Sequence, residues 1–227
     1  MSRLVVTIDG PAASGKSTVA RLLADKLNAT FLDTGAMYRA VTLAAMQKDA
    51  DLTDEKQLID VLDNTEFKFE AVPDGMRVHV AGADVTDEIR GPQVTASARY
   101  VAALAPARRR LVEMQRRFAE KYDKIVTEGR DQGTVAFPDA DVKFFLIADL
   151  DERARRRQAE LETKGIEQTI EQIRQAIQKR DDSDEKRFVG PLKPAADAIV
   201  IDTTDLTIEG VVDKLLACVK ERCSGKS

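Results

Sequence analysis

A glycine-rich segment near the N-terminus holds the residues whose types and spacing most clearly predict chemistry. It reads Gly10-Pro11-Ala12-Ala13-Ser14-Gly15-Lys16-Ser17-Thr18 and matches G-x-x-x-x-G-K-[ST], whose backbone N–H groups surround a polyphosphate. Glycine is needed at both ends because a Cβ would block the tight turn and the approach of backbone to phosphate. Lys16 is predicted to reach the β and γ phosphates of a nucleoside triphosphate, and the Ser17 hydroxyl to bind Mg²⁺.

Downstream arginines recur at helical spacing, in two clusters. The clusters are Arg153, Arg156 and Arg157, and Arg180, Asp184 and Arg187. The second would lie on one face if its helix continues that far. Guanidinium groups stabilise the charge that spreads over a phosphoryl group during transfer. The competing interpretation is a solvated helix face with surface ion pairs.

Motifs of other phosphate-loop proteins are missing from the sequence. It has no N-K-x-D or D-x-x-G of the switch GTPases and no L-S-G-G-Q of the transporter ATPases. Together with the arginines, this favours a kinase that holds two phosphorylated ligands. A nucleotide-dependent RNA-binding module that uses Arg108, Arg109 and Arg110, with Arg116 and Arg117, is the alternative from another class.

The acceptor of the phosphoryl group is only partly constrained. A nucleoside monophosphate needs no base, because its second pKa of about 6 leaves most of it dianionic at pH 7. The scarcity of histidine, with His79 alone in an alternating segment, is compatible with such an acceptor. A hydroxyl acceptor stays possible, because Asp33 or Asp131 could serve as its base.

Alternating strands and helices are predicted to position these residues. Buried strands are expected at 4–8, 29–32, 124–128, 142–148 and 198–201, and helices at 16–27, 36–47, 53–62, 93–103, 106–122, 151–164, 169–182 and 207–223. Thr34 is the expected N-cap of helix 36–47. Residues 67–70, 76–80 and 83–85 alternate with period two, which predicts a small antiparallel meander.

This order predicts an α/β fold with a five-stranded parallel sheet flanked by helices. Ligands of such sheets bind beyond the carboxyl ends of the strands, where Gly10, Asp33 and Arg130 fall.

Composition fits a soluble enzyme. The 227 residues are 43% hydrophobic and 33% charged, with a formal net charge of −4, which argues against a dedicated nucleic-acid binder. No membrane span or signal peptide is evident, so a cytoplasmic protein is expected. Cys218 and Cys223 are expected to be free thiols.

The chain also resembles the bacterial cytidylate kinases, a family of nucleoside monophosphate kinases, over almost its whole length. The residues that carry the resemblance are Ile8 to Thr18, Leu32-Asp33-Thr34-Gly35-Ala36-Met37-Tyr38-Arg39, Asp87-Glu88-Ile89-Arg90, Glu128-Gly129-Arg130-Asp131, Gly133-Thr134-Val135, Arg180-Asp181 through Asp184, and Arg187 to Leu192. One departure is Arg99, which stands where the family usually has a serine.

The resemblance implies a division of the chain. Core segments are expected at 1–34, 123–150 and 168–227, an enlarged nucleoside-monophosphate domain at 35–122 with the meander near 65–100, and a mobile helical lid at 151–167. The implied reaction is ATP-dependent phosphorylation of CMP and dCMP by a monomer, with Mg²⁺ as cofactor and no nucleic-acid or membrane partner.

The resemblance also implies residue roles. ATP would be held by residues 10–18, with Lys16 on the transferring phosphoryl group. CMP would be bound by Thr34, Tyr38, Arg39, Arg108, Arg130, Asp131, Arg180, Asp184 and Arg187, of which Arg39 and Arg130 grip its phosphate. Arg153 and Arg157 would enter with the lid and, with Lys16, Arg130 and Arg180, form the catalytic set.

Overall fold

The computed structural model describes residues 3–73, 75–163 and 165–224. The described chain divides into two compact units, one of residues 30–125 and one of residues 3–29 together with 126–224.

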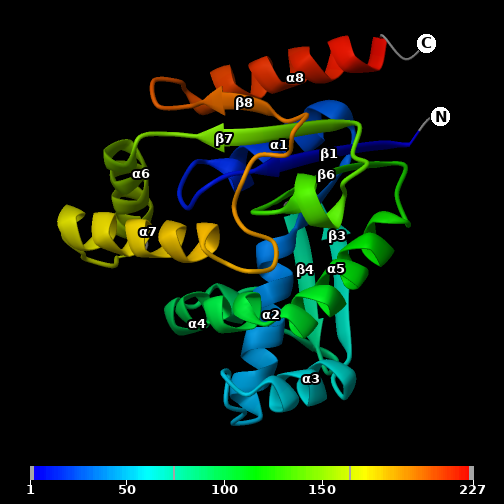
Figure 1. The fold of residues 1–227 in the computed structure, drawn as a ribbon, viewed down its shortest axis with the longest axis vertical. Helices are drawn as coiled ribbons and strands as arrows, with labels where there is room; N and C mark the ends of the chain where they lie inside the picture. Colours follow the sequence, from blue (N-terminus) through cyan, green and yellow to red (C-terminus); the bar gives the residue numbers. More distant parts are fainter. Residues whose placement is uncertain (1–2, 74, 164, 225–227) are drawn as a thin grey trace. The chain divides into compact units, whose positions relative to one another are not determined.

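The predicted five-stranded sheet is present. Its strands are β1 (Leu4–Asp9), β2 (Thr30–Asp33), β6 (Lys124–Gly129), β7 (Val142–Ile147) and β8 (Ile199–Asp202). They are ordered β2-β6-β1-β7-β8, and β7 pairs in parallel with both β1 and β8 (Figure 1). Apolar side chains such as Val6, Ile8, Phe144 and Leu146 are buried, as expected for parallel strands covered on both faces.

Four helices belong to the unit of residues 3–29 and 126–224: α1 (Lys16–Leu27), α6 (Leu150–Glu162), α7 (Ile170–Glu185) and α8 (Ile208–Ser224). Helix α1 packs against α8, and α6 packs against α7. Each presents apolar residues at helical spacing, for example Val19, Ala20 and Leu23 of α1, all buried. A π-helical turn at Gln132–Ala136 follows β6, which the sequence pattern did not predict.

The unit of residues 30–125 contains the predicted meander. Its strands β3 (Phe67–Val72), β4 (Gly75–Val80) and β5 (Ala83–Asp84) form an antiparallel sheet in that order. The helices of this unit are α2 (Thr34–Gln47), α3 (Glu55–Asp63), α4 (Pro92–Ala103) and α5 (Ala105–Ala119), with a short 3-10 turn at Glu88–Arg90. Helix α2 is the central helix, because it packs against α3, α4 and β4.

Two local predictions were wrong. The N-cap of α2 is Asp33 and not Thr34, because the Asp33 carboxylate accepts the Ala36 N–H at 2.8 Å. The helix therefore begins at Thr34, earlier than the predicted residue 36. Helix α7 ends at Glu185, so Arg187 does not share a helical face with Arg180 and Asp184. In the described residues, no helix is both long enough and apolar enough to cross a membrane.

The compact unit of residues 30–125 overlaps the predicted nucleoside-monophosphate domain at 35–122. Helix α6, which makes up most of the predicted lid, lies in the other unit, with the phosphate loop. The roles of these segments and the movement of the lid stay predictions.

Candidate active site

The glycine-rich loop lies between the carboxyl end of β1 and the N-terminus of α1, as predicted. Gly10 has φ 152°, and a Cβ there would lie 2.2 Å from the Leu146 carbonyl oxygen, so only glycine fits. Gly15 is the N-cap of α1 with φ 85°. Ala13 also has a left-handed backbone, with φ 58°, which costs a residue with a Cβ roughly 1–2 kcal/mol. The loop therefore stores strain that its surroundings must hold.

Lys16 is buried in this loop, near two arginines and two carboxylates. Its ammonium donates to the Pro11 carbonyl and, at 3.2 Å, to Ser14 Oγ. Burial lowers the pKa of Lys16 well below its usual value, and the positive charges of Arg130 and Arg180 lower it further, against Glu128 and Asp181. Positive charges gathered around a buried lysine in a glycine-rich loop fit an anionic ligand such as a polyphosphate.

Ser17 lies beside a carboxylate that sequence reasoning missed. Its hydroxyl donates to Glu128 Oε1 at 2.9 Å, and Glu128, near the end of β6, is buried. A hydroxyl and a carboxylate at this place fit Mg²⁺, which takes one or two protein oxygens together with phosphate oxygens and water. The described residues contain no group of three His, Cys, Asp or Glu that could hold a metal alone. The signal in the sequence was the position of Glu128 directly before Gly129-Arg130-Asp131.

Arg130, Asp184 and Arg187 form one ion-pair cluster. The Arg130 Nε donates to Asp184 Oδ2 at 2.7 Å, and Arg187 NH1 lies 3.6 Å from Asp184 Oδ1. Burial acts to raise the pKa of Asp184, but Arg130 and then Arg187 outweigh it, so this pKa lies below its usual value. Burial acts to lower the pKa of Arg130, but Asp184 and Glu128 keep it raised. Both groups are therefore charged, and three predicted substrate-binding residues are brought together.

Asp9 fixes the segment that follows Arg130. Its two carboxylate oxygens accept the N–H groups of Gln132 and Gly133, each at 2.8 Å. Burial raises the pKa of Asp9 to about 6, which the two hydrogen bonds oppose and the nearby Asp131 supports. Asp131 itself is buried. The predicted residues Arg130 and Asp131 thus directly precede a segment that is bonded to the end of β1.

The first arginine cluster separates in the structure, and Arg153 is the member that points inward. Arg153 is buried; its NH1 donates to the Ala12 carbonyl at 3.1 Å and pairs with Asp181 Oδ2, while its Nε donates to the Ala148 carbonyl at 3.0 Å. Asp181 Oδ1 accepts the Ala12 N–H at 2.9 Å. Arg153 is therefore bonded to the phosphate loop itself.

The other two arginines of this cluster have different partners. Arg156 donates to the Thr203 carbonyl at 2.6 Å and to its hydroxyl at 3.1 Å, beyond the end of β8. Arg157 pairs with Glu160 at 2.7 Å and is half-buried. Of the three, Arg157 has the partner that is easiest to exchange, because its ion pair is partly exposed and lies within its own helix.

A second group of predicted residues lies in the unit of residues 30–125. Arg39 NH2 lies 3.3 Å from Asp33 Oδ2, and Arg90 NH2 lies 4.0 Å from the same oxygen. The guanidinium of Arg108 lies over the ring of Tyr38, 5.6 Å from its centroid. Thr34 is buried at the start of α2. Arg90 belongs to the quoted Asp87-Glu88-Ile89-Arg90 motif but was not among the predicted site residues.

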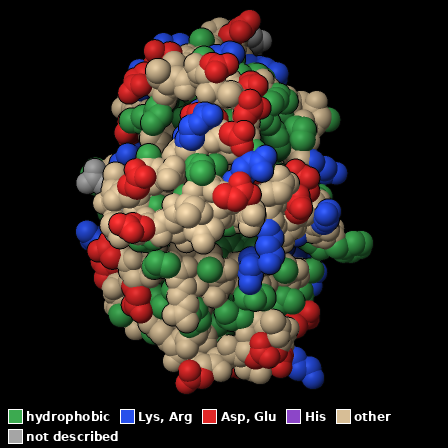
Figure 2. Space-filling view, turned by 90° about the vertical axis from the view of Figure 1, so that its left-hand side faces the viewer, with side chains coloured by type: hydrophobic (Ala, Val, Ile, Leu, Met, Phe, Trp, Pro, Cys, Tyr) green, Lys and Arg blue, Asp and Glu red, His purple; other side chains and the backbone are tan. Residues whose placement is uncertain are grey.

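The RNA-binding alternative gains no support from the structure. Arg108, one of its five arginines, is buried, and Arg110 pairs with Asp63 at 3.0 Å. On the face shown in Figure 2, acidic side chains of the described residues are interspersed with the basic ones. A nucleic-acid surface requires a basic stripe.

The fold and the loop define a class of protein, the phosphate-loop nucleotide-binding proteins. The cytidylate kinase family model matches residues 6–221. The cytidylate kinase of Anoxybacillus flavithermus is 45% identical to this chain, over 98% of this chain and 99% of that relative. The cytidylate kinase of Bacillus subtilis is 43% identical, over 97% of this chain and 98% of that relative.

A solved structure of an uncharacterized protein from Eubacterium ventriosum shares the fold. Its TM-score is 0.51 at 15% identity, with 97% of this chain and 99% of that chain covered. The sequence matches decide the family: the chain belongs to the cytidylate kinase family.

Proposed function

We propose that the protein transfers the γ-phosphoryl group of ATP to CMP, and also to dCMP, in one direct in-line step without a covalent enzyme intermediate. The observation that carries the proposal is the buried Lys16 in a strained phosphate loop, with Arg130 and Arg180 near enough to lower its pKa. Membership of the cytidylate kinase family supports the choice of acceptor.

On the donor side, residues 10–18 are proposed to bind the phosphates of ATP through backbone N–H groups and the Lys16 ammonium. Ser17 and Glu128 are proposed to hold Mg²⁺, directly or through its water. When bound, this ion neutralises charge on the β and γ oxygens. The protein's contribution is then to fix the positions of the hydroxyl, the carboxylate and the lysine.

On the acceptor side, the proposed CMP-binding residues are those that the family resemblance implies. They are Thr34, Tyr38, Arg39, Arg108, Arg130, Asp131, Arg180, Asp184 and Arg187. Arg39 and Arg130 are proposed to bind the CMP phosphate, because guanidinium groups bind phosphate in bidentate fashion. Asp184 and Arg180 are proposed to bind the pentose hydroxyls. A dianionic CMP phosphate attacks without a base, so neither Asp33 nor Asp131 is required to accept a proton.

Arg157 is proposed to contact the transferring phosphoryl group when the lid closes, which would exclude water and suppress hydrolysis of ATP. The contacts of Arg153 with Ala12 and Asp181 do not favour the same role for it. The proposal takes free nucleotides as the ligands and a single chain as the active unit.

Turnover of a panel of acceptors tests the proposal. CMP, dCMP, UMP, AMP and shikimate are supplied with MgATP, and formation of ADP is followed for each. The proposal predicts that CMP gives the highest kcat/KM. A preference for AMP or shikimate would replace it with another phosphate-loop kinase.

A further inference from the structure

One residue of the phosphate loop, Ala12, is held by both of its backbone polar groups. Its N–H donates to Asp181 Oδ1 at 2.9 Å, and its carbonyl accepts from Arg153 NH1 at 3.1 Å. Arg153 and Asp181 also pair with each other. The Arg153–Asp181 ion pair and the backbone of Ala12 therefore form a closed set of hydrogen bonds.

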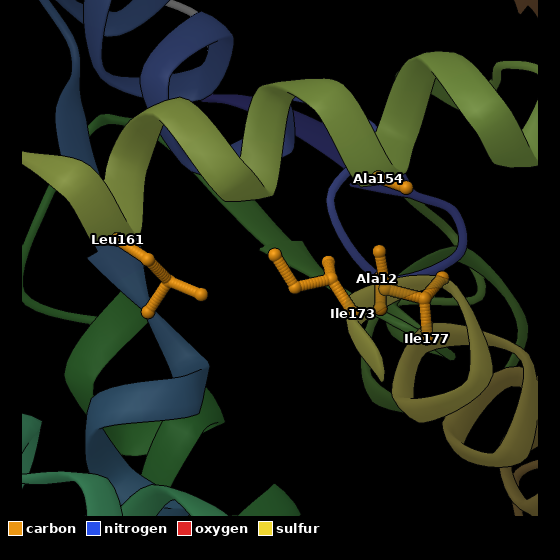
Figure 3. Packing of buried hydrophobic residues seen from close by; sticks show 5 residues of the cluster. All are labelled: Ala12, Ala154, Leu161, Ile173 and Ile177. Atoms are coloured by element: carbon orange, nitrogen blue, oxygen red, sulfur yellow. The ribbon is translucent and has the colours of Figure 1, made fainter. Parts of the chain in front are cut away.

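The side chain of Ala12 is held as well. Its methyl group packs in a buried apolar cluster with Ala154 and Leu161 of α6 and with Ile173 and Ile177 of α7 (Figure 3). Helices α6 and α7 thus hold Ala12 by packing as well as by hydrogen bonds.

The residue that follows is the strained one. Ala13 has φ 58°, a conformation that a residue with a Cβ adopts only where its surroundings impose it. A buried ion pair is weak evidence for stability alone, because desolvation of two charges offsets their attraction. Its place beside the strained residue points instead to a geometric role.

We propose that Arg153 and Asp181 are positioning residues that hold Ala12, and so keep Ala13 in the left-handed conformation with which the loop binds triphosphate. The inference rests on the proposed function only for the identity of the donor, ATP. Neither side chain needs to touch the nucleotide for this role.

A double-mutant comparison tests the role. Asp181→Asn keeps an oxygen for the Ala12 N–H but weakens the attraction to Arg153, and we expect it to raise the Kd for MgATP roughly tenfold. The KM for CMP at saturating MgATP changes less than about twofold. Where Asp181→Asn does not fold, Arg153→Lys replaces it, because an ammonium keeps the charge but cannot reproduce the planar set of donors.

Rescue by Ala13→Gly separates positioning from stability. Glycine adopts the left-handed conformation without the steric cost, so in that background Asp181→Asn should raise the Kd for MgATP less than about threefold. Thermal unfolding of all variants is measured in parallel. If the ion pair only stabilised the fold, Asp181→Asn would lower the unfolding temperature in both backgrounds, and Ala13→Gly would not reduce the increase in the Kd for MgATP.

Matched controls come from the same helices. Asp182→Asn changes the neighbouring acidic residue of α7, which accepts from Gln178 at 2.8 Å. Arg155→Gln changes an exposed arginine of α6, which pairs with Glu152 at 2.9 Å. Both are expected to bind MgATP like the wild type.

Two results would overturn the inference: an unchanged Kd for MgATP in Asp181→Asn, or an equal increase with Ala13 and with Gly at position 13. A wild type that binds MgATP but does not phosphorylate CMP would contradict the proposed function instead, and the comparison of the variants would still stand.

Discussion

The Nε of Arg130 donates to Asp184 Oδ2 at 2.7 Å, which joins the segment after β6 to the last turns of α7. The two side chains are 16% and 14% exposed, so the pair is largely removed from water. Asp184 thus orients the guanidinium that is proposed to bind the CMP phosphate, and the pair would link the proposed phosphate and pentose contacts of the acceptor.

Asp184→Asn tests this link. The variant removes the charge that orients Arg130, so we expect the KM for CMP to rise roughly tenfold or more, about 1.4 kcal/mol, while the Kd for MgATP stays within about twofold. Because a buried charge loses its partner, the free energy of unfolding should fall by about 3 kcal/mol. Steady-state kinetics and urea unfolding measure both effects.

Glu185→Gln, an exposed change at the neighbouring position of α7, is the control and should change neither value. An equal loss of MgATP affinity in Asp184→Asn would contradict an acceptor role for Asp184.

Glu128→Gln tests the proposed Mg²⁺ site. The amide keeps the hydrogen bond with Ser17 but loses the negative charge, so we expect half-maximal activity to require roughly tenfold more free Mg²⁺. Titration of activity with Mg²⁺ at fixed ATP measures the shift. An unchanged Mg²⁺ requirement would exclude Glu128 from the metal site.

The raised pKa of Asp9 predicts how the free energy of unfolding depends on pH. Its pKa is about 6 in the folded protein and 3.8 in the reference state, so the folded state binds the proton more tightly between these values. Stability from this group therefore rises as the pH falls from about 6 to about 4, by about 2 kcal/mol at 1.36 kcal/mol per unit.

Urea unfolding of the wild type and Asp9→Asn at several pH values measures this effect. The variant has no carboxyl group to titrate at position 9, so the wild type should gain about 2 kcal/mol relative to it between pH 7 and pH 4. Parallel pH profiles would show that Asp9 titrates normally.

Gly10→Ala tests the close approach of the phosphate loop to β7. The new Cβ would lie 2.2 Å from the Leu146 carbonyl oxygen, and we expect a loss of about 3 kcal/mol in the free energy of unfolding beyond that of the control. Gly75→Ala is the matched control, because Gly75 also has a positive φ, 137°, but a Cβ there would meet no heavy atom within 4 Å. Equal losses would show that conformation, and not the Leu146 contact, requires glycine at position 10.

Local patterns were sufficient to predict the strands and helices, because the period of apolar residues changes cleanly between the meander and the α/β segments. They were not sufficient to choose the N-cap of α2: Asp33 and Thr34 are both good caps, and the start of the helix decides between them. The π-helical turn at 132–136 depends on a carboxylate more than 120 residues away in sequence, Asp9, which no local pattern reveals.

The phosphate loop was predictable because its chemistry is contiguous in sequence. The hydrogen-bond and ion-pair partners of single side chains were not predictable, because they depend on tertiary packing. Arg153 and Arg157 have the same residue type and lie one helical turn apart, yet one is buried against Ala12 and the other pairs with Glu160. Asp181 and Glu128 were missed as site residues for the same reason.

Phosphorus NMR of a mixture of MgATP and CMP with catalytic amounts of the protein follows the proposed phosphoryl transfer itself. ADP and CDP should appear in equal amounts, with negligible inorganic phosphate, and a Lys16→Ala variant should form neither at a comparable rate. ADP and inorganic phosphate without CDP would contradict the proposed transfer.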